Sequence, residues 1–303
     1  MRARILRGMQ LNVVERTVRT PDGRTLAVEE TGDPAGPAIL VHMGSPNSRH
    51  LYLPNAADAA TRGLRLICYD RPGYGGSTPQ PGRSHADCAA DVRAICAALR
   101  IDRLGIWGIS GGGAHALACA ALLPGLAVGV ACLAGLAPYD AEGLDWFDGM
   151  GKDNADDFRL LVTDKTASRA KMDQDREQLL AATADGLAGA LESLLSPVDA
   201  AALTGDLARY LAFTGHEGLA PGSEGWWEDA CAQVGPWGFG LAGIKVPVLL
   251  MHGREDKFVP FGHGRWLAAR IPGVDARLLD GDGHLTLLRN RVPEVHAWLA
   301  ERF

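Results

Sequence analysis

Short runs of apolar residues alternate along this chain with longer segments that have helical spacing. Near-continuous apolar runs are typical of parallel strands whose sheet is covered by helices on both faces. Six runs are predicted to be buried strands: Ala38–His42, Leu64–Tyr69, Leu104–Ile109, Val128–Leu133, Val246–His252 and Ala276–Leu279. Helical spacing is found over Ala86–Leu99, Gly113–Leu123, His263–Ile271 and Pro293–Phe303. The alternation predicts an α/β fold with a mostly parallel central sheet and helices on both of its faces.

Two parts of the chain depart from this alternation. The first is a pair of alternating runs within Val13–Glu30, joined at Pro21-Asp22-Gly23, and it predicts an antiparallel hairpin. The second, from Pro138 to Gly240, contains no convincing strand and has helical stretches at Asp153–Val162 and Asp173–Leu195. We therefore expect residues 1–137 and 241–303 to form a core domain, with residues 138–240 inserted as a helical cap.

Composition separates the same middle segment from the rest of the chain. The 303 residues are 47% hydrophobic, which is enough apolar material for a sizeable core. The formal net charge is −6, but residues 138–240 alone contain 19 acidic and 7 basic residues, a local charge of −12. The chain lacks the basic footprint of a nucleic-acid or anionic-membrane binder, so we expect neither as a partner.

The cysteines and the apolar runs bear on the cellular setting. None of the six cysteines forms a Cys-x-x-Cys pair or another spacing typical of metal sites. We therefore expect reduced thiols and no bound metal. The N-terminal residues lack the continuous apolar stretch of a signal peptide, and no run approaches the roughly 18–20 apolar residues of a membrane span. These features predict a soluble, cytoplasmic protein.

The most informative motif is Gly108-Ile109-Ser110-Gly111-Gly112, which follows a predicted strand and precedes a helix of small residues. A Gly-x-Ser-x-Gly turn exposes a strained nucleophilic serine at the carboxyl edge of a sheet, and the glycines are needed because the reversal crowds the backbone. The helix start also directs free backbone amides at that point. By itself the motif is equally consistent with a glycine-rich turn that holds a phosphate. It has neither the Lys-Ser/Thr ending of a P-loop nor the spacing of a dinucleotide fingerprint.

A serine nucleophile needs a base, and the base needs an acid that orients it. Asp256 stands just past the predicted strand Val246–His252, and His284 follows the last predicted strand in a glycine-flanked loop. Ser110, Asp256 and His284 are therefore predicted to lie at the carboxyl edge of the sheet, where open α/β sheets build their sites. Eight other histidines are present, none of them in a loop of this kind. Other candidates for the acid are Glu255, Asp282 and Asp140.

Together these motifs closely resemble those of the α/β-hydrolase superfamily in its capped form. The resemblance covers nearly the whole chain and extends to Asp70–Ser77 and His252–Pro260. The chain order Ser110, Asp256, His284 is the order found in that superfamily. The resemblance gives Asp70–Ser77 a role in shaping the fold and none in catalysis.

The resemblance also implies an oxyanion hole made of two backbone amides. One belongs to Gly111, the residue after the nucleophile. The other lies in His42-Met43-Gly44-Ser45-Pro46, where many relatives have His-Gly-x-Pro. Keeping Gly-x-Pro in register places the donor at Ser45, which we prefer, whereas matching His42 to the family histidine places it at Met43 or Gly44.

The implied function is that of a serine hydrolase of the esterase and iminopeptidase-like branch. Its expected substrate is a small, moderately hydrophobic carboxylic ester, thioester or lactone. This small-molecule substrate is the only partner that we expect. Acyl transfer of this kind requires no metal or organic cofactor. Alternatives are a proline iminopeptidase-like enzyme, a C–C bond hydrolase, and a non-hydrolytic biosynthetic or binding relative of the fold. The sequence sets no oligomeric state.

The predicted cap is rich in aromatic residues, which either line a substrate pocket above the sheet edge or fasten the cap to the core. The residues assigned to the pocket are Met43, Trp146, Trp227 and Trp237.

Overall fold

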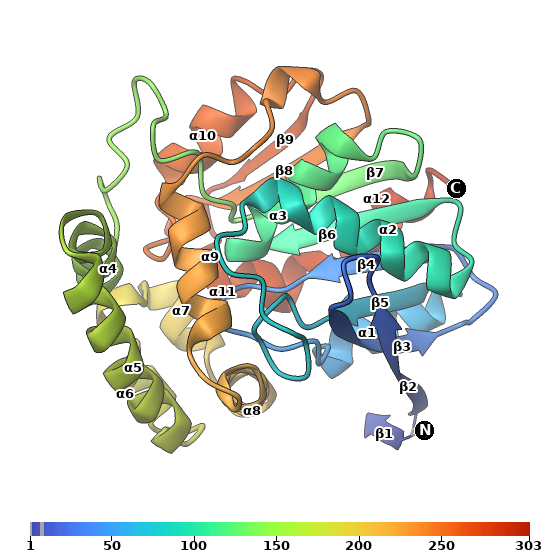
Figure 1. The fold of residues 1–303 in the computed structure, drawn as a ribbon, viewed down its shortest axis with the longest axis horizontal. Coiled ribbons are helices and arrows are strands. Elements are labelled where there is room, and N and C mark those ends of the chain that lie inside the picture. Colours follow the sequence, from blue (N-terminus) through green and yellow to red (C-terminus); the bar gives the residue numbers. More distant parts are fainter. Residues whose placement is uncertain (1, 7–8) are drawn as a thin grey trace.

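One nine-stranded sheet runs through the molecule (Figure 1). The computed structural model describes residues 2–6 and 9–303, and the strand order is β1-β2-β3-β5-β4-β6-β7-β8-β9. Strands β4 to β9 pair in parallel, and β1 to β3 are antiparallel to their neighbours. Their bounds are β1 Arg2–Leu6, β2 Met9–Arg19, β3 Thr25–Gly32, β4 Ala38–His42, β5 Arg65–Tyr69, β6 Leu104–Ile109, β7 Ala127–Leu133, β8 Val248–Gly253 and β9 Asp275–Leu279.

Strands are present at all six predicted positions and at the N-terminal hairpin, with ends that differ by a residue or two. The prediction that Ala276–Leu279 is buried is wrong, because β9 is the last strand of the sheet and its residues are exposed or partly exposed. The hairpin turns at Gly23, whose φ of +90° is available to glycine at little cost. Residues 14–19 of β2 pair with residues 25–30 of β3. The predicted α/β fold class with a mostly parallel sheet is confirmed.

Helices cover both faces of the sheet. α2 (Cys88–Leu99), α3 (Gly111–Leu122) and α10 (Phe261–Ala268) pack on one face, and α1 (Leu53–Thr61) and α12 (Val292–Ala300) pack on the other. Successive residues of each central strand contribute to the two apolar cores in turn. Because both faces are covered, β4, β6 and β8 are buried at every position, which explains their continuous apolar sequences.

The chain between β7 and β8 forms helices and no strand, and we call residues 138–240 the helical segment. In Figure 1, α4 and α5 lie at the left edge, and α9 lies between them and the sheet. A helix over Asp173–Leu195 is a wrong prediction: α5 ends at Ala181 because Ala182 is extended, with ψ of 130°, and only short turns follow. The helices are α4 Lys152–Thr163, α5 Lys165–Ala181, α6 Leu187–Ala190, α7 Pro197–Ala202, α8 Gly205–Leu219 and α9 Glu224–Val234.

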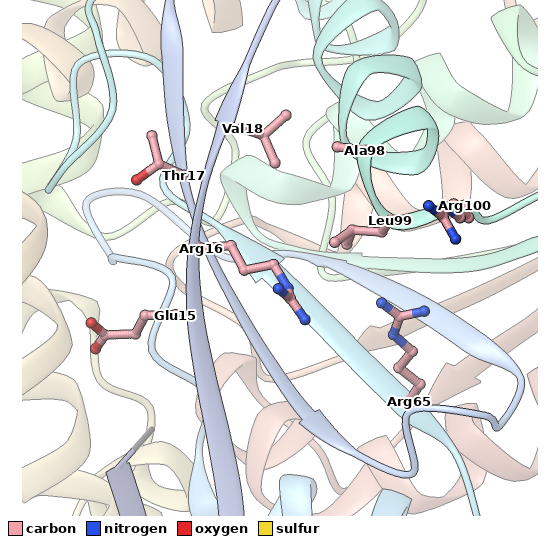
Figure 2. Close-up of a pocket in the computed structure, with 8 residues that line it drawn as sticks. All are labelled: Glu15, Arg16, Thr17, Val18, Arg65, Ala98, Leu99 and Arg100. Carbon is pink, nitrogen blue, oxygen red and sulfur yellow. The ribbon is translucent and has the colours of Figure 1, made fainter.

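A hollow of about 590 Å³ opens between the N-terminal hairpin and the end of α2 (Figure 2). Its charged lining residues include Arg16 and Arg65. Arg65 begins β5, so the hollow lies at the amino edge of the parallel strands and away from the edge where Ser110 stands. Among the described residues, no helix is both long and apolar enough to cross a membrane.

Candidate active site

The candidate nucleophile Ser110 occupies the turn between β6 and α3. Its backbone has φ of +56° and ψ of −127°, a conformation that residues with side chains rarely adopt and that persists only where the surroundings enforce it. Ser110 N donates to Leu133 O at 2.9 Å, and Gly113 N donates to Ser110 O at 2.8 Å. The partly exposed side chain therefore stands at the start of α3, where the first helical amides lack partners within the helix.

Glycines around Ser110 allow backbone segments to approach closely. A side chain on Gly108 would collide with the carbonyl group of Gly112, and one on Gly112 would collide with the carbonyl group of His42. A Cβ atom on Gly44 would lie 3.2 Å from Ser110 Cβ. The packing of α3 against β4 and β6 thus requires the glycine pattern, and it brings the loop after β4 beside Ser110.

The candidate base His284 begins α11 (His284–Thr286), in the loop that follows β9. Its Nδ1 lies 2.7 Å from Asp256 Oδ2, and the Asp256 side chain is fully buried. Asp256 Oδ1 accepts a hydrogen bond from Val259 N at 2.8 Å, which holds the carboxylate in place. The Phe258 ring stacks on the imidazole with its centroid 4.6 Å away. These contacts orient the ring and leave Nε2 as the nitrogen available to a substrate.

No hydrogen bond joins Ser110 to His284 in the part of the chain that the structure describes. Within residues 2–6 and 9–303, the imidazole hydrogen bond is to Asp256, and Ser110 Oγ makes no hydrogen bond to the ring. Contacts of this kind often tighten only when a substrate is bound. The catalytic roles of Ser110, Asp256 and His284 stay predictions.

Sequence reasoning did not single out Asp199, which lies in α7 of the helical segment and has no exposed surface. Its carboxylate accepts hydrogen bonds from three successive backbone amides, those of His284 at 2.8 Å, Leu285 at 2.7 Å and Thr286 at 3.2 Å. A Cβ atom on Gly283 would lie 2.6 Å from Asp199 Cγ, so this contact requires the glycine. The helical segment therefore supports the backbone of the candidate base directly.

Only one local signal accompanies Asp199. The run Ser196-Pro197-Val198-Asp199 has the spacing of a helix start, and Ser196 Oγ does accept a hydrogen bond from Asp199 N. Such a signal predicts the beginning of a helix. It carries no information about a partner 85 residues further along the chain.

Charge near His284 alters its protonation. Burial lowers the pKa of His284, but the attraction and hydrogen bond of Asp256, aided by Asp199, raise it by more, so that the pKa lies above its ordinary value. Burial raises the pKa of the Asp199 carboxyl above its ordinary value, although hydrogen bonds from the backbone amides of His284 and Thr286 lower it in part. The carboxylates of Asp256 and Asp199 thus stabilise the imidazolium form of His284.

The candidate oxyanion donors belong to two segments that meet beside Ser110. A Cβ atom on Gly111 would lie 3.3 Å from Ser45 N and 2.6 Å from Ser45 Oγ. The turn at Ser45 is closed by a hydrogen bond from Asn47 N to Gly44 O at 2.9 Å, and Arg71 Nη1 donates to the carbonyl oxygen of Met43. Ser45 N and Gly111 therefore lie side by side, and their use as an oxyanion hole stays a prediction.

A buried cluster of charge joins α9 of the helical segment to this loop. Asp229 has 1% of its surface exposed and accepts hydrogen bonds from Arg71, from Arg83 at 2.6 Å, from Tyr74 at 2.9 Å and from Ser45 Oγ. Burial opposes the ionisation of Asp229, but Arg71 and Arg83 hold its pKa well below the ordinary value. The cluster fixes α9 above the loop that carries Ser45.

The histidine inside the elbow helix is part of the packing. His115 is buried, and its Nδ1 lies 2.9 Å from Gly111 O. Its Nε2 lies 3.5 Å from Arg83 Nη1, on the side of the Asp229 cluster. Burial and the neighbouring His85 lower the pKa of His115 well below its ordinary value. A neutral ring therefore connects the first turn of α3 to the cluster.

The residues assigned to the pocket lie in different surroundings. Met43, Trp146 and Trp237 are almost wholly buried in three separate apolar clusters. Trp146 Nε1 donates to Ala137 O at 3.0 Å, and Arg169 lies over the partly exposed ring of Trp227 in α9. These packing contacts are those expected of residues that fasten the helical segment to the core. The assignment of these residues to a substrate pocket stays a prediction.

Asp282, one of the other candidates for the acid, forms an ion pair with Arg291 at 2.8 Å. Asp256 is the carboxylate in contact with the imidazole.

One set of buried side chains has the composition of a metal site. His42, Cys88 and Cys119 place their ligand atoms within 4.8 Å of one another, and the two Sγ atoms lie 3.8 Å apart. Hydrogen bonds with Cys88 and His42 lower the pKa of the Cys119 thiol below its ordinary value, although burial acts against them. All six cysteines are free thiols in the structure.

Comparison with known proteins identifies the family. The sequence model of the alpha/beta hydrolase fold matches residues 37–290. The chain belongs to this α/β-hydrolase family. The match spans the turn at Ser110, the loop at Asp256 and the loop at His284.

Relatives within the α/β-hydrolase family have several activities. The chain is 27% identical to the AB hydrolase superfamily protein YisY of Bacillus subtilis over 271 residues, which covers 88% of this chain and 91% of that protein. It is 24% identical over 303 residues to a 2-hydroxy-6-oxononadienedioate/2-hydroxy-6-oxononatrienedioate hydrolase of Cupriavidus pinatubonensis, covering 91% of this chain and 93% of that one. An esterase structure from Exiguobacterium antarcticum superposes with a TM-score of 0.68 and 19% identity, covering 95% and 99% of the two chains. The family membership supports hydrolase chemistry without specifying the bond.

Proposed function

We propose that this chain is a serine hydrolase that cleaves small, moderately hydrophobic carboxylic esters, thioesters or lactones. Ser110 is the nucleophile, His284 the general base and Asp256 the group that orients the base. The backbone amides of Ser45 and Gly111 hold the oxyanion. The observation that carries the proposal is the 2.7 Å contact between Asp256 Oδ2 and His284 Nδ1 at the sheet edge where the strained Ser110 stands.

The first half of the reaction forms an acyl-enzyme. Nε2 of His284 takes the hydroxyl proton while Ser110 Oγ attacks the scissile carbonyl carbon, and Nδ1 stays bonded to Asp256. The carbonyl oxygen becomes an oxyanion and accepts hydrogen bonds from Ser45 N and Gly111 N. One such donor typically contributes about 10²–10³ in rate, because the amides are already in place when the charge develops.

The imidazolium of His284 gives its proton to the departing alkoxide or thiolate, which completes the acyl-enzyme. In the second half, the neutral ring takes a proton from water as the water oxygen attacks the acyl carbon. The imidazolium then returns that proton to Ser110 Oγ as the bond between Ser110 and the acyl group breaks, which releases the acid and regenerates the free hydroxyl. Asp256 keeps the ring in one tautomer throughout, so that Nε2 faces the reacting atoms at each step.

A fluorophosphonate probe and p-nitrophenyl esters of short acids test this proposal. Wild-type protein is expected to be labelled and to hydrolyse the esters, whereas Ser110→Ala loses labelling and at least about 10³-fold of kcat/KM. Ser193→Ala, in the helical segment, serves as the matched control and keeps both. An unlabelled wild type without Ser110-dependent turnover would contradict the proposal.

The role of His284 has its own test. His284→Ala is expected to slow labelling strongly while its circular dichroism spectrum stays that of the wild type. Labelling at the wild-type rate would remove His284 as the base.

C–C bond hydrolysis is a second candidate function. It is favoured by the 24% identity to the 2-hydroxy-6-oxononadienedioate hydrolase over 91% of this chain. Assays of 2-hydroxy-6-oxo-dienoate compounds beside the p-nitrophenyl esters distinguish the two functions. A kcat/KM for the dienoates above that for every ester would favour the second candidate.

A further inference from the structure

The inner face of α9 contacts the candidate oxyanion region at two successive turns. Asp229 binds the Ser45 hydroxyl group, and Gln233 follows one helical turn later on the same face. Gln233 has 4% of its surface exposed. Its Nε2 lies 3.3 Å from the point where a Cβ atom on Gly111 would stand, and Ser45 N lies 3.3 Å from that same point. The Gln233 carboxamide therefore borders Gly111 on the side of this glycine that also faces Ser45.

The Gln233 carboxamide carries an unused hydrogen-bonding atom. Within the described residues, Oε1 is buried and has no hydrogen-bond partner. A buried amide oxygen without a donor is unfavourable, and native proteins keep few of them. The neighbouring carboxylate of Asp229 is by contrast fully engaged by Arg71, Arg83, Tyr74 and Ser45. Gln233 is thus the polar group of this face that is left for a ligand.

We propose that Gln233 binds the acyl part of the substrate, and that the enzyme prefers acyl groups with a hydroxyl on the carbon next to the scissile carbonyl. The inference rests on the proposed serine-hydrolase function. When the carbonyl oxygen lies between Ser45 N and Gly111 N, the next carbon of the acyl chain lies one bond beyond the carbonyl carbon. A substituent on that next carbon then falls beside the Gln233 carboxamide. A hydroxyl group matches both of its atoms, because it donates to Oε1 and accepts from Nε2.

Methyl 2-hydroxypropanoate and methyl propanoate are the matched probe substrates. They differ by one hydroxyl group, and the ratio of their kcat/KM values is compared with the ratio of their hydroxide-catalysed rates. We expect the wild type to favour one enantiomer of the hydroxy ester by about tenfold or more beyond the hydroxide ratio. A ratio equal to the hydroxide ratio for both enantiomers would overturn the inference.

Two substitutions at Gln233 separate recognition from packing. Gln233→Leu removes both polar atoms of the carboxamide. We expect the kcat/KM for the preferred hydroxy ester, divided by that for methyl propanoate, to fall about tenfold, towards the ratio of the hydroxide-catalysed rates. Gln233→Glu keeps an acceptor of the same shape, so the preference for the hydroxy ester survives while kcat falls on both esters, because a negative charge then lies beside the oxyanion. Gln174→Leu, on the exposed side of α5, is the matched control and keeps the wild-type ratio.

The outcomes distinguish this inference from the function on which it rests. Ser110-dependent turnover of both esters with no hydroxyl preference, or a Gln233→Leu protein with the wild-type ratio, contradicts the role of Gln233 alone. Absence of Ser110-dependent labelling and turnover contradicts the proposed function. If Gln233→Leu does not fold, the wild-type ratio and the Gln233→Glu ratio still decide the question.

Discussion

The parallel sheet and the helical segment are attached to the rest of the molecule by different kinds of contact. Helix α3 meets the sheet through apolar side chains and through glycines that let the backbones touch, as at Gly108 and Gly112. The helical segment also uses buried polar side chains. Asp229 binds Arg71 and Arg83, Asp199 binds the amides of the His284 loop, and the carbonyl oxygen of Trp146 lies 2.9 Å from Nε2 of the buried His263 in α10.

The difference matters because the two kinds of contact have different specificity. Apolar packing tolerates exchanges of similar volume, whereas a buried charge is stable only with its own partners in place. Asp229 and Asp199 reach two different loops of the candidate site, the Ser45 loop and the His284 loop. The helical segment therefore helps to position both loops of the candidate site.

The largest expected effect comes from removing the buried charge of α9. Asp229→Ala leaves the buried charges of Arg71 and Arg83 without their carboxylate partner, so we expect the free energy of unfolding to fall by about 3–5 kcal/mol, together with loss of esterase activity. Urea denaturation followed by circular dichroism measures the change. The control is Asp156→Ala, an exposed ion pair with Lys152 on α4, which is expected to leave the midpoint unchanged. If both variants unfolded at the wild-type midpoint, the helical segment would not depend on buried charge.

A smaller effect is expected at Asp199. Asp199→Ala removes the acceptor of three amides and loosens the backbone that carries His284, so kcat/KM for p-nitrophenyl esters is expected to fall about 10–100-fold. The protein should stay folded, because its apolar cores are untouched. Asp185→Ala, an exposed acid of the same segment, should keep wild-type kinetics. Equal kinetics for the two variants would show that the His284 loop holds its position without the helical segment.

The smallest effect is a shift in pH dependence. His284 must be neutral to act as a base, and Asp256 with Asp199 raises its pKa above the ordinary value. Activity is therefore expected to fall as the pH drops through that raised pKa. Asp199→Asn removes one of the raising charges, so the acidic limb of the kcat/KM profile should move to lower pH. An acidic limb at the same or a higher pH would show that the charge of Asp199 does not raise the pKa of His284.

The same shift has a consequence for stability. Because the pKa of His284 is higher in the folded state, its contribution to stability is complete below the ordinary histidine pKa and is lost as the pH rises through the raised value. Unfolding measured on both sides of that range should show the loss in the wild type, with a smaller loss in Asp199→Asn.

Much of the sheet could be predicted because its signal is local. Each buried strand is a short apolar run, and the turn at Ser110 is recognisable because its conformation and close contacts demand glycines at fixed positions. The contact of Asp256 with His284 follows from the loops after β8 and β9, two strands that pair in the sheet. In the helical segment the signal is weaker, and the predicted helix at Asp173–Leu195 is wrong because helix-forming residues continue past the break at Ala182.

The sequence by itself determined the α/β-hydrolase fold and the candidate residues Ser110, Asp256 and His284, because strand periodicity and glycine-rich turns are encoded within a few residues of each site. Only the tertiary structure decided what Asp199, Asp229 and Gln233 do. Their partners lie far away along the chain, and in a helix an acid or an amide with a buried partner has the same local pattern as one on a solvated surface. Tertiary packing turns three ordinary polar residues into supports of the Ser45 and His284 loops and a candidate contact for the acyl group.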